Sequence, residues 1–96
     1  MNPKYFPFPH EQTAFTIADD QAVIIMADTG QVTVLNEVAT RVWQLADGKH
    51  SLKVVEEILC KEFDESEDII HADFEEFVQR MVDIGAIVLL EEPPEE

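Results

Sequence analysis

Cysteine and glycine are scarce in this sequence, and their scarcity excludes several kinds of site. The single cysteine, Cys60, lies in a helical pattern and has no partner for an intramolecular disulfide or a CxxC pair. We therefore expect it to be a small core residue. The three glycines, Gly30, Gly48 and Gly85, are too dispersed to form a glycine-rich phosphate-binding loop.

Residue patterns that support catalysis or metal binding are also lacking. The histidines, His10, His50 and His71, do not have the spacing of metal ligands. Ser51 and Ser66 both precede helical patterns, where they are expected to cap helices rather than act as nucleophiles. Carboxylates are abundant, but nothing in the sequence indicates a crowded or buried pair with shifted pKa values. The sequence therefore predicts no catalytic residue, no metal site and no cofactor.

Basic residues form the third deficit. The chain has 6 Lys and Arg against 21 Asp and Glu, a formal net charge of −15. Such a surface repels nucleic acids and anionic membranes, and it either favours basic partners or serves solubility alone. The longest apolar run, Ala22 to Ala27, is too short to cross a bilayer, and the N-terminus does not resemble a signal peptide. We expect a cytoplasmic protein that binds neither nucleic acid nor membrane.

The residues that are present divide into three segments. Residues 1–12 alternate aromatics with prolines, which favour extended backbone, so they are predicted to form an arm that docks on the domain or on a neighbouring molecule. Residues 13–90 contain recurrent apolar positions and are expected to form one folded domain. Residues 91–96, with the sequence EEPPEE, are predicted to be a disordered acidic tail.

Three short strands are predicted at the start of the domain. Ala14 to Ala18 is rich in β-formers, Ala22 to Ala27 is a continuous apolar run, and Gln31 to Leu35 alternates polar and apolar residues. Asp19 with Asp20, and the segment Asp28 to Gly30, provide tight turns between them. Connections this short predict an antiparallel meander in which the third strand lies at an edge.

Three helical patterns follow the strands. The first is capped by Asn36 and ends near Ala46, the second is capped by Ser51, and the third begins near Ser66 and ends at Gly85. This order predicts an α+β, winged-helix-like fold, with a three-stranded antiparallel meander followed by three helices. Folds of this kind often bind DNA. Here the third helix carries many acidic residues against a single arginine, which argues against insertion into a major groove.

The ordered series of elements resembles the PqqD-like proteins, also called RiPP recognition elements. A glycine turn leads to a strand that ends in Leu-Asn before a helix, an Asp-Gly turn precedes a capped helix, and the last helix closes at a glycine. The resemblance covers about residues 22–90, and the N-terminal arm has no counterpart in it. The residues that carry it are Ile24, Asp28, Gly30, Val34, Leu35, Asn36, Val42, Trp43, Asp47, Gly48, Ser51, Val55, Ile58, Leu59, Asp73, Phe74, Phe77, Val78, Met81 and Gly85.

The resemblance implies a binding function without catalysis. Members of the family bind the leader segment of a ribosomally made precursor peptide and present its core to a modifying enzyme, often a radical SAM enzyme. The leader is implied to lie as an added strand on the third strand, in a groove bounded by the third helix. The alternative is a structural or regulatory interaction domain that self-associates through the same sheet edge, so the chain is expected to be a monomer or a homodimer.

The predicted peptide-binding site combines the edge strand with one face of the third helix. The unpaired N–H and C=O groups of an edge strand can bond to another extended chain. We expect Val78 and Val82 to form the floor of a groove beside Val32 and Val34, although this part of the helix could instead pack against residues 86–90 or the arm. The charges at Asp73, Glu75 and Asp83 either meet basic residues of a peptide or form a solvated face. The predicted site residues are Gln31, Val32, Thr33, Val34, Leu35, Asp73, Phe74, Val78, Met81 and Val82.

Overall fold

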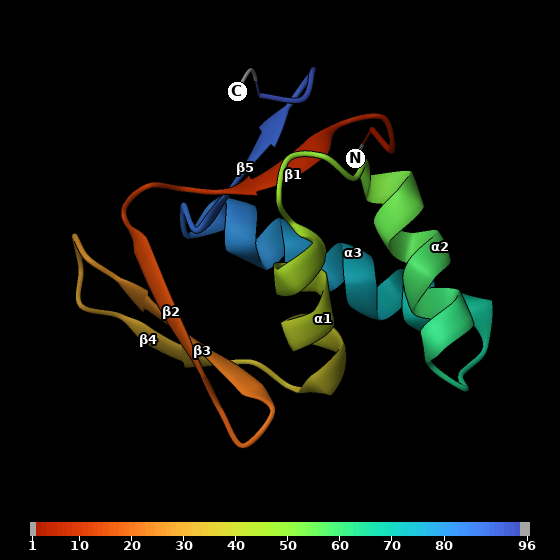
Figure 1. Cartoon of the computed structure of the whole chain (residues 1–96), viewed down its shortest axis with the longest axis horizontal. Helices are drawn as coiled ribbons and strands as arrows, with labels where there is room; N and C mark the ends of the chain where they lie inside the picture. Colours follow the sequence, from red (N-terminus) through yellow and green to blue (C-terminus); the bar gives the residue numbers. More distant parts are fainter. Residues whose placement is uncertain (1, 95–96) are drawn as a thin grey trace.

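β-branched and aromatic residues form an antiparallel sheet of three strands in the computed structural model, which describes residues 2–94 (Figure 1). Strands β2 (Thr13–Ala18), β3 (Gln21–Met26) and β4 (Val32–Val34) lie in the order β2-β3-β4. Asp19 and Asp20 join β2 to β3 with φ angles of 51° and 65°, the positive values that the two central residues of a type I′ hairpin turn adopt. The predicted meander, with its third strand at an edge, is confirmed.

Three helices follow the sheet: α1 (Glu37–Leu45), α2 (Leu52–Glu62) and α3 (Glu67–Asp83). α1 packs against β3, and α2 and α3 pack against α1 (Figure 1). Each begins after the residue predicted to cap it. The side chains of Asn36, Ser51 and Ser66 accept hydrogen bonds from backbone N–H groups in the first turns of α1, α2 and α3. Each cap satisfies one of the N–H groups that a helix start leaves without an intrahelical partner. The predicted order of three strands and three helices in an α+β fold is therefore confirmed.

The core lies between the sheet and the helices. Along β3, Ala22, Ile24 and Met26 are buried, while the alternate residue Ile25 is exposed, as the two-residue period of a strand requires. Cys60 is half-buried and packs against this core, close to the expected role. The helices contribute a set of side chains that are all at least nine-tenths buried: Ala39, Val42, Trp43, Leu45, Leu52, Val55, Leu59, Ile70, Phe74, Phe77, Val78 and Met81.

The proline-rich N-terminal residues join the domain as a strand. β1 (Phe6–Pro9) pairs antiparallel with β5 (Ile87–Leu90) in a second sheet, and Pro7 is among the fully buried side chains. The carbonyls of Pro3 and Tyr5 accept the N–H groups of Lys53 and Leu52, at the start of α2. A proline-rich segment suits this position because prolines accept hydrogen bonds but cannot donate them. The sequence predicted extended backbone here but not its partner.

The turn between α1 and α2 helps to hold this arm. Gly48 has φ +79°, a left-handed conformation that favours glycine, and its N–H donates to the carbonyl of Pro7. A Cβ at this position would lie 2.8 Å from both Phe8 Cδ1 and Pro94 Cδ, so the arm and the start of the tail pack directly against the glycine. Of the predicted tail 91–96, residues 91–94 are exposed and belong to no helix or strand, and residues 95 and 96 lie outside the described part of the chain.

Candidate functional site

The outer edge of β4 has no strand beside it. Leu35 N–H donates to the carbonyl of Ala22, and Met26 N–H donates to the carbonyl of Gln31, so these bonds bracket the Ile24–Thr33 pair. Backbone groups alternate in direction along an antiparallel pair, and Val32 and Val34 therefore direct their N–H and C=O groups away from β3. Within residues 2–94, β1 pairs with β5 and no strand pairs with this side of β4. The edge is open to another chain.

A buried threonine fixes this edge relative to α1. Thr40 is 5% exposed, and its Oγ1 accepts the N–H of Ala22 at 2.9 Å while lying 3.4 Å from the carbonyl oxygen of Leu35, to which it donates. The hydroxyl thus bridges the start of β3 and the residue that follows β4. Because both strands are tied to the same helix, the position of the edge next to α1 is set by the core and not by a loop.

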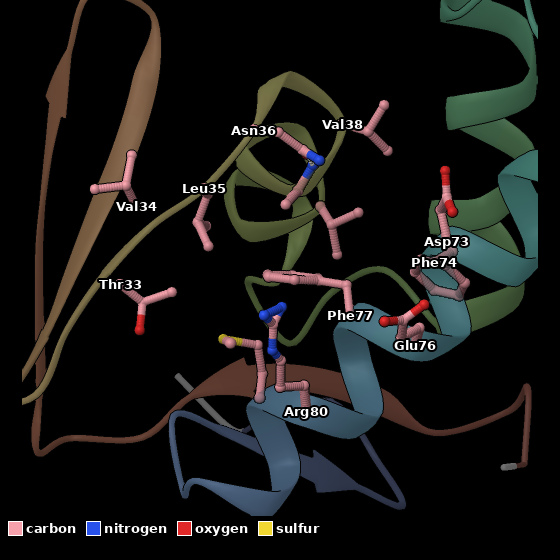
Figure 2. Close-up of a pocket in the computed structure, with 13 residues that line it drawn as sticks. Thr33, Val34, Leu35, Asn36, Val38, Asp73, Phe74, Glu76, Phe77 and Arg80 are labelled. Atoms are coloured by element: carbon pink, nitrogen blue, oxygen red, sulfur yellow. Dashed lines mark hydrogen bonds between the residues drawn. The ribbon is translucent and has the colours of Figure 1, made fainter.

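A pocket of about 300 Å³ lies between this edge, α1 and α3. In Figure 2 the ring of Phe77 extends from α3 across the middle of the pocket, and Thr33 and Val34 lie on its far side. Its volume is at the lower end of the range for ligand pockets, enough for side chains but small for a large cofactor. Its lining residues are Thr33, Val34, Leu35, Asn36, Val38, Ala39, Val42, Asp73, Phe74, Glu76, Phe77, Arg80 and Met81.

Most of the predicted site residues meet at this pocket. Thr33, Val34, Leu35, Asp73, Phe74 and Met81 line it. Val32 lies on the same edge strand without lining the pocket, and its side chain is 59% exposed. Gln31 precedes β4, and its carbonyl already accepts a hydrogen bond from β3.

Val78 and Val82 do not form the floor of the groove, and this prediction is corrected. Val78 is completely buried, and Val82 packs against the core without lining the pocket. Successive residues of a helix are about 100° apart around its axis. Val78 and Val82 therefore lie on one side of the buried face formed by Phe74, Phe77 and Met81, and Glu76 and Arg80 lie on the other side. The pocket opens on the flank of Glu76 and Arg80. Val78 joins the buried core, which continues through Ala86 to Ile87, the first residue of β5.

Three pocket residues on α3 were missed by the prediction: Glu76, Phe77 and Arg80. Phe77 is only 9% exposed, so its ring belongs to the core and also lines the pocket. Glu76 and Arg80 enter the sequence-based prediction only through the charge balance of the third helix. One signal could have found them, since Arg80 is the only arginine or lysine in a helix that is otherwise acidic.

Ion pairs outside the pocket connect the helices. Arg41 Nε and Nη2 donate to the two carboxylate oxygens of Glu62 at 2.8 and 2.9 Å, which joins α1 to α2 and lowers the pKa of Glu62. His71 Nδ1 is hydrogen-bonded to Glu56, which joins α2 to α3. This hydrogen bond, together with the charges of Glu56 and Glu75, raises the pKa of His71. The described residues hold no group of three or more His, Cys, Asp or Glu side chains arranged to bind a metal ion.

Two solved structures share this fold. One is described as TbiB1 in complex with the TbiA(beta) leader peptide: it is 18% identical, the match covers 83% of this chain and 93% of that chain, and the TM-score is 0.75. The other is described as lasso peptide synthetase B1 complexed with the leader peptide, with 18% identity, 86% and 98% coverage and a TM-score of 0.76. At this identity the likeness shows the fold. No curated protein matches the chain.

A family comparison gives a more direct assignment. The sequence model described as coenzyme PQQ synthesis protein D (PqqD) matches residues 21–87, which run from the start of β3 to the start of β5. The matched part includes β4, all three helices and every residue that lines the pocket. Because the match spans well over half of the sequence, the chain belongs to the PqqD family.

Proposed function

We propose that this chain is a non-catalytic module that binds the leader segment of a ribosomally made precursor peptide and presents it to a modifying enzyme, such as a radical SAM enzyme. The observation that carries the proposal is the unpaired edge of β4 beside a pocket. Both structural relatives are complexes with a leader peptide, and we extend this ligand to a chain of the same fold. The family assignment supports the same function.

The proposed binding mode is addition of a strand. Val32 and Val34 each offer an N–H and a C=O at the open edge, four groups in all, to an extended peptide. Alternate side chains of that peptide then point toward the pocket, where Phe74, Phe77 and Met81 provide apolar surface. In this mode Leu35 and Thr33 orient the edge, since their N–H groups face β3.

The backbone bonds alone are too weak to explain binding. At about 0.5–1.5 kcal/mol each, four hydrogen bonds contribute about 2–6 kcal/mol. Association costs at least about 4 kcal/mol in lost translational and rotational freedom, and ordering of a flexible peptide adds to this. Side chains in the pocket therefore have to provide the remaining affinity and the selectivity among peptides.

The chemistry in this proposal belongs to the partner enzyme. Two of the histidines in the described residues interact with carboxylates, His50 with Asp47 and His71 with Glu56, in positions that support turns and helix packing. No helix in residues 2–94 has the length and apolarity to cross a membrane. We propose a cytoplasmic location, where ribosomal peptides are made.

The same edge also supports a second candidate function, which is self-association. Val32 and Val34 are 59% and 63% exposed on a strand with a free side, and two copies could pair through their edges. This reading predicts a dimer in sedimentation velocity, and it predicts that the dimer dissociates when the edge is blocked.

The test is a selection from a displayed library of random 12-residue peptides, followed by titration of a selected synthetic peptide into ¹⁵N-labelled protein. Leader recognition predicts amide shift changes at Val32 to Val34 and along the pocket face of α3. The exposed face of α2 serves as the internal reference and is expected not to change. Failure to select any binder, or binders whose shift changes avoid β4, would contradict the proposal. A peptide-insensitive dimer formed through β4 would favour self-association instead.

A further inference from the structure

Arg80 is the single Lys or Arg side chain among the residues that line the pocket. It sits on α3 together with the acidic lining residues Asp73 and Glu76. In Figure 2 its side chain extends from the helix into the space between Phe77 and the β4 side of the pocket. Arg80 therefore places a positive charge beside the edge strand in a chain whose net charge is −15.

Within the described residues the Arg80 side chain has no ion pair or hydrogen bond, although an acidic residue is close in sequence. Glu76 lies four residues before it, which is the favourable order for an ion pair on a helix, yet the two side chains do not pair. Arg41 differs from Arg80 in this respect, because its guanidinium donates hydrogen bonds to both carboxylate oxygens of Glu62. The Arg80 guanidinium therefore keeps its donors available to a ligand in the pocket.

The surroundings of Arg80 favour a planar anion. An arginine presents a rigid fork of donors that matches the two oxygens of a carboxylate. Phe77 and Met81 border the same pocket, and a peptide that covers this side of α3 would exclude water from the guanidinium. Exclusion of water strengthens an ion pair relative to one at a free surface.

We propose that Arg80 is a specificity residue that recognises the carboxylate of an Asp or Glu side chain in the bound segment. The inference rests on the proposed function and adds the charge pattern of the ligand. A uniformly basic peptide would place a like charge against Arg80, and a uniformly acidic one would be repelled by Asp73, Glu76 and the net charge of the chain. The structure thus favours one acidic residue among neutral or basic neighbours.

The spacing of the helix gives this pattern a scale. Glu76 lies four residues from Arg80, about 6 Å along the axis of α3. Two residues of extended peptide span about 6.6 Å and point to the same side of the strand. Two peptide residues on the same side of the added strand are therefore about as far apart as Glu76 and Arg80 are along the helix.

The experiment repeats the displayed 12-residue peptide selection on three forms of the chain: wild type, Arg80→Glu and Lys61→Glu. Lys61 is exposed on α2 outside this pocket, so its substitution makes the same change in net charge without altering the site. We expect wild type and Lys61→Glu to enrich Asp or Glu at one fixed position relative to the apolar residues. Arg80→Glu is expected to enrich Lys or Arg at that position.

A selected peptide then gives the quantitative test. Replacing its acidic residue with Lys is expected to weaken binding to wild type about tenfold and to restore binding to Arg80→Glu. The peptide is synthesised with an amidated C-terminus, and loss of binding on amidation would assign the recognised carboxylate to the terminus and overturn the side-chain proposal. Arg80→Gln, which removes the charge without reversing it, is expected to lose the acidic preference.

The outcomes separate this inference from the proposed function. Peptides that shift the β4 amides but show no acidic preference, or keep the same preference with Arg80→Glu, overturn the role of Arg80 and leave leader binding intact. An absence of peptides that bind at β4 counts against the proposed function itself. Amide spectra of each variant verify that the fold is retained, and Arg80→Gln decides the question if Arg80→Glu does not fold.

Discussion

Replacement of Val34 by proline tests the open edge at a single atom. The Val34 N–H points away from β3, so a proline there removes a hydrogen bond to an added strand while leaving the β3–β4 bonds in place. The proline ring also occupies the space where the carbonyl of an incoming peptide would approach. The Val34 side chain is 63% exposed, so its loss removes little core packing.

The magnitude follows from the number of bonds. Loss of one of the four outward groups costs about 0.5–1.5 kcal/mol, and obstruction by the ring weakens a neighbouring bond by a similar amount. Together they amount to about 1–3 kcal/mol, or about a 5- to 150-fold increase in Kd. The stability of the domain should change far less, because no bond within the sheet is lost.

The assay is isothermal titration of a selected library peptide into Val34→Pro and into two controls. Val34→Ala keeps the N–H and is expected to bind within a few-fold of wild type. Thr33→Pro removes an N–H that faces Ile24 and is expected to destabilise the sheet itself. If Val34→Pro retains a folded spectrum and wild-type affinity, the peptide does not add to β4 and the reasoning above is wrong.

Three further outcomes are expected. Thr40→Val leaves the buried N–H of Ala22 unsatisfied, so it should lower the free energy of unfolding in urea by about 1–3 kcal/mol. Thr40→Ser keeps the hydroxyl and should lower it by about 0.8 kcal/mol. Equal losses would refute the role of the hydroxyl. Gly48→Ala should destabilise the chain more than Gly30→Ala in the same urea assay. Both positions have positive φ, but a Cβ would collide with Phe8 at Gly48 and meets no atom within 4 Å at Gly30. Equal effects would contradict the packing of the arm. The pKa of His71 should exceed its ordinary value in an NMR titration of its ring, and a pKa at or below that value would contradict the contact with Glu56. The stability that the charged ring adds should be present at low pH and lost as pH rises through the raised pKa. His71→Gln should remove this pH dependence.

Local chemistry made much of the fold predictable from the sequence. Asn36, Ser51 and Ser66 each cap the helix expected of them, because a side-chain oxygen next to an N–H group of the first turn needs no tertiary context. The edge position of β4 followed from short connections alone. These features depend on residues close together in the sequence.

The features that sequence reasoning missed depend on distant contacts. The pairing of β1 with β5 joins residues from opposite ends of the chain. Because proline is rare in strands, the propensities of residues 6–9 do not predict a strand. The orientation of α3 about its axis could not be read from its apolar pattern, which is wide enough to fit either flank. The burial of Val78 and the position of Arg80 at the pocket show which way α3 is turned. This orientation results from the packing of β5 and α1 around the helix.

The sheet formed by β1 and β5 has a practical consequence for how the module can be attached to other proteins. The two strands lie side by side, at a part of the domain well away from β4 in Figure 1. A linker to an affinity tag, a surface or an enzyme can therefore leave from either side of this small sheet without crossing the open edge of β4. The same architecture can serve as a free subunit or as a fused domain, with the open edge of β4 left unobstructed in both cases.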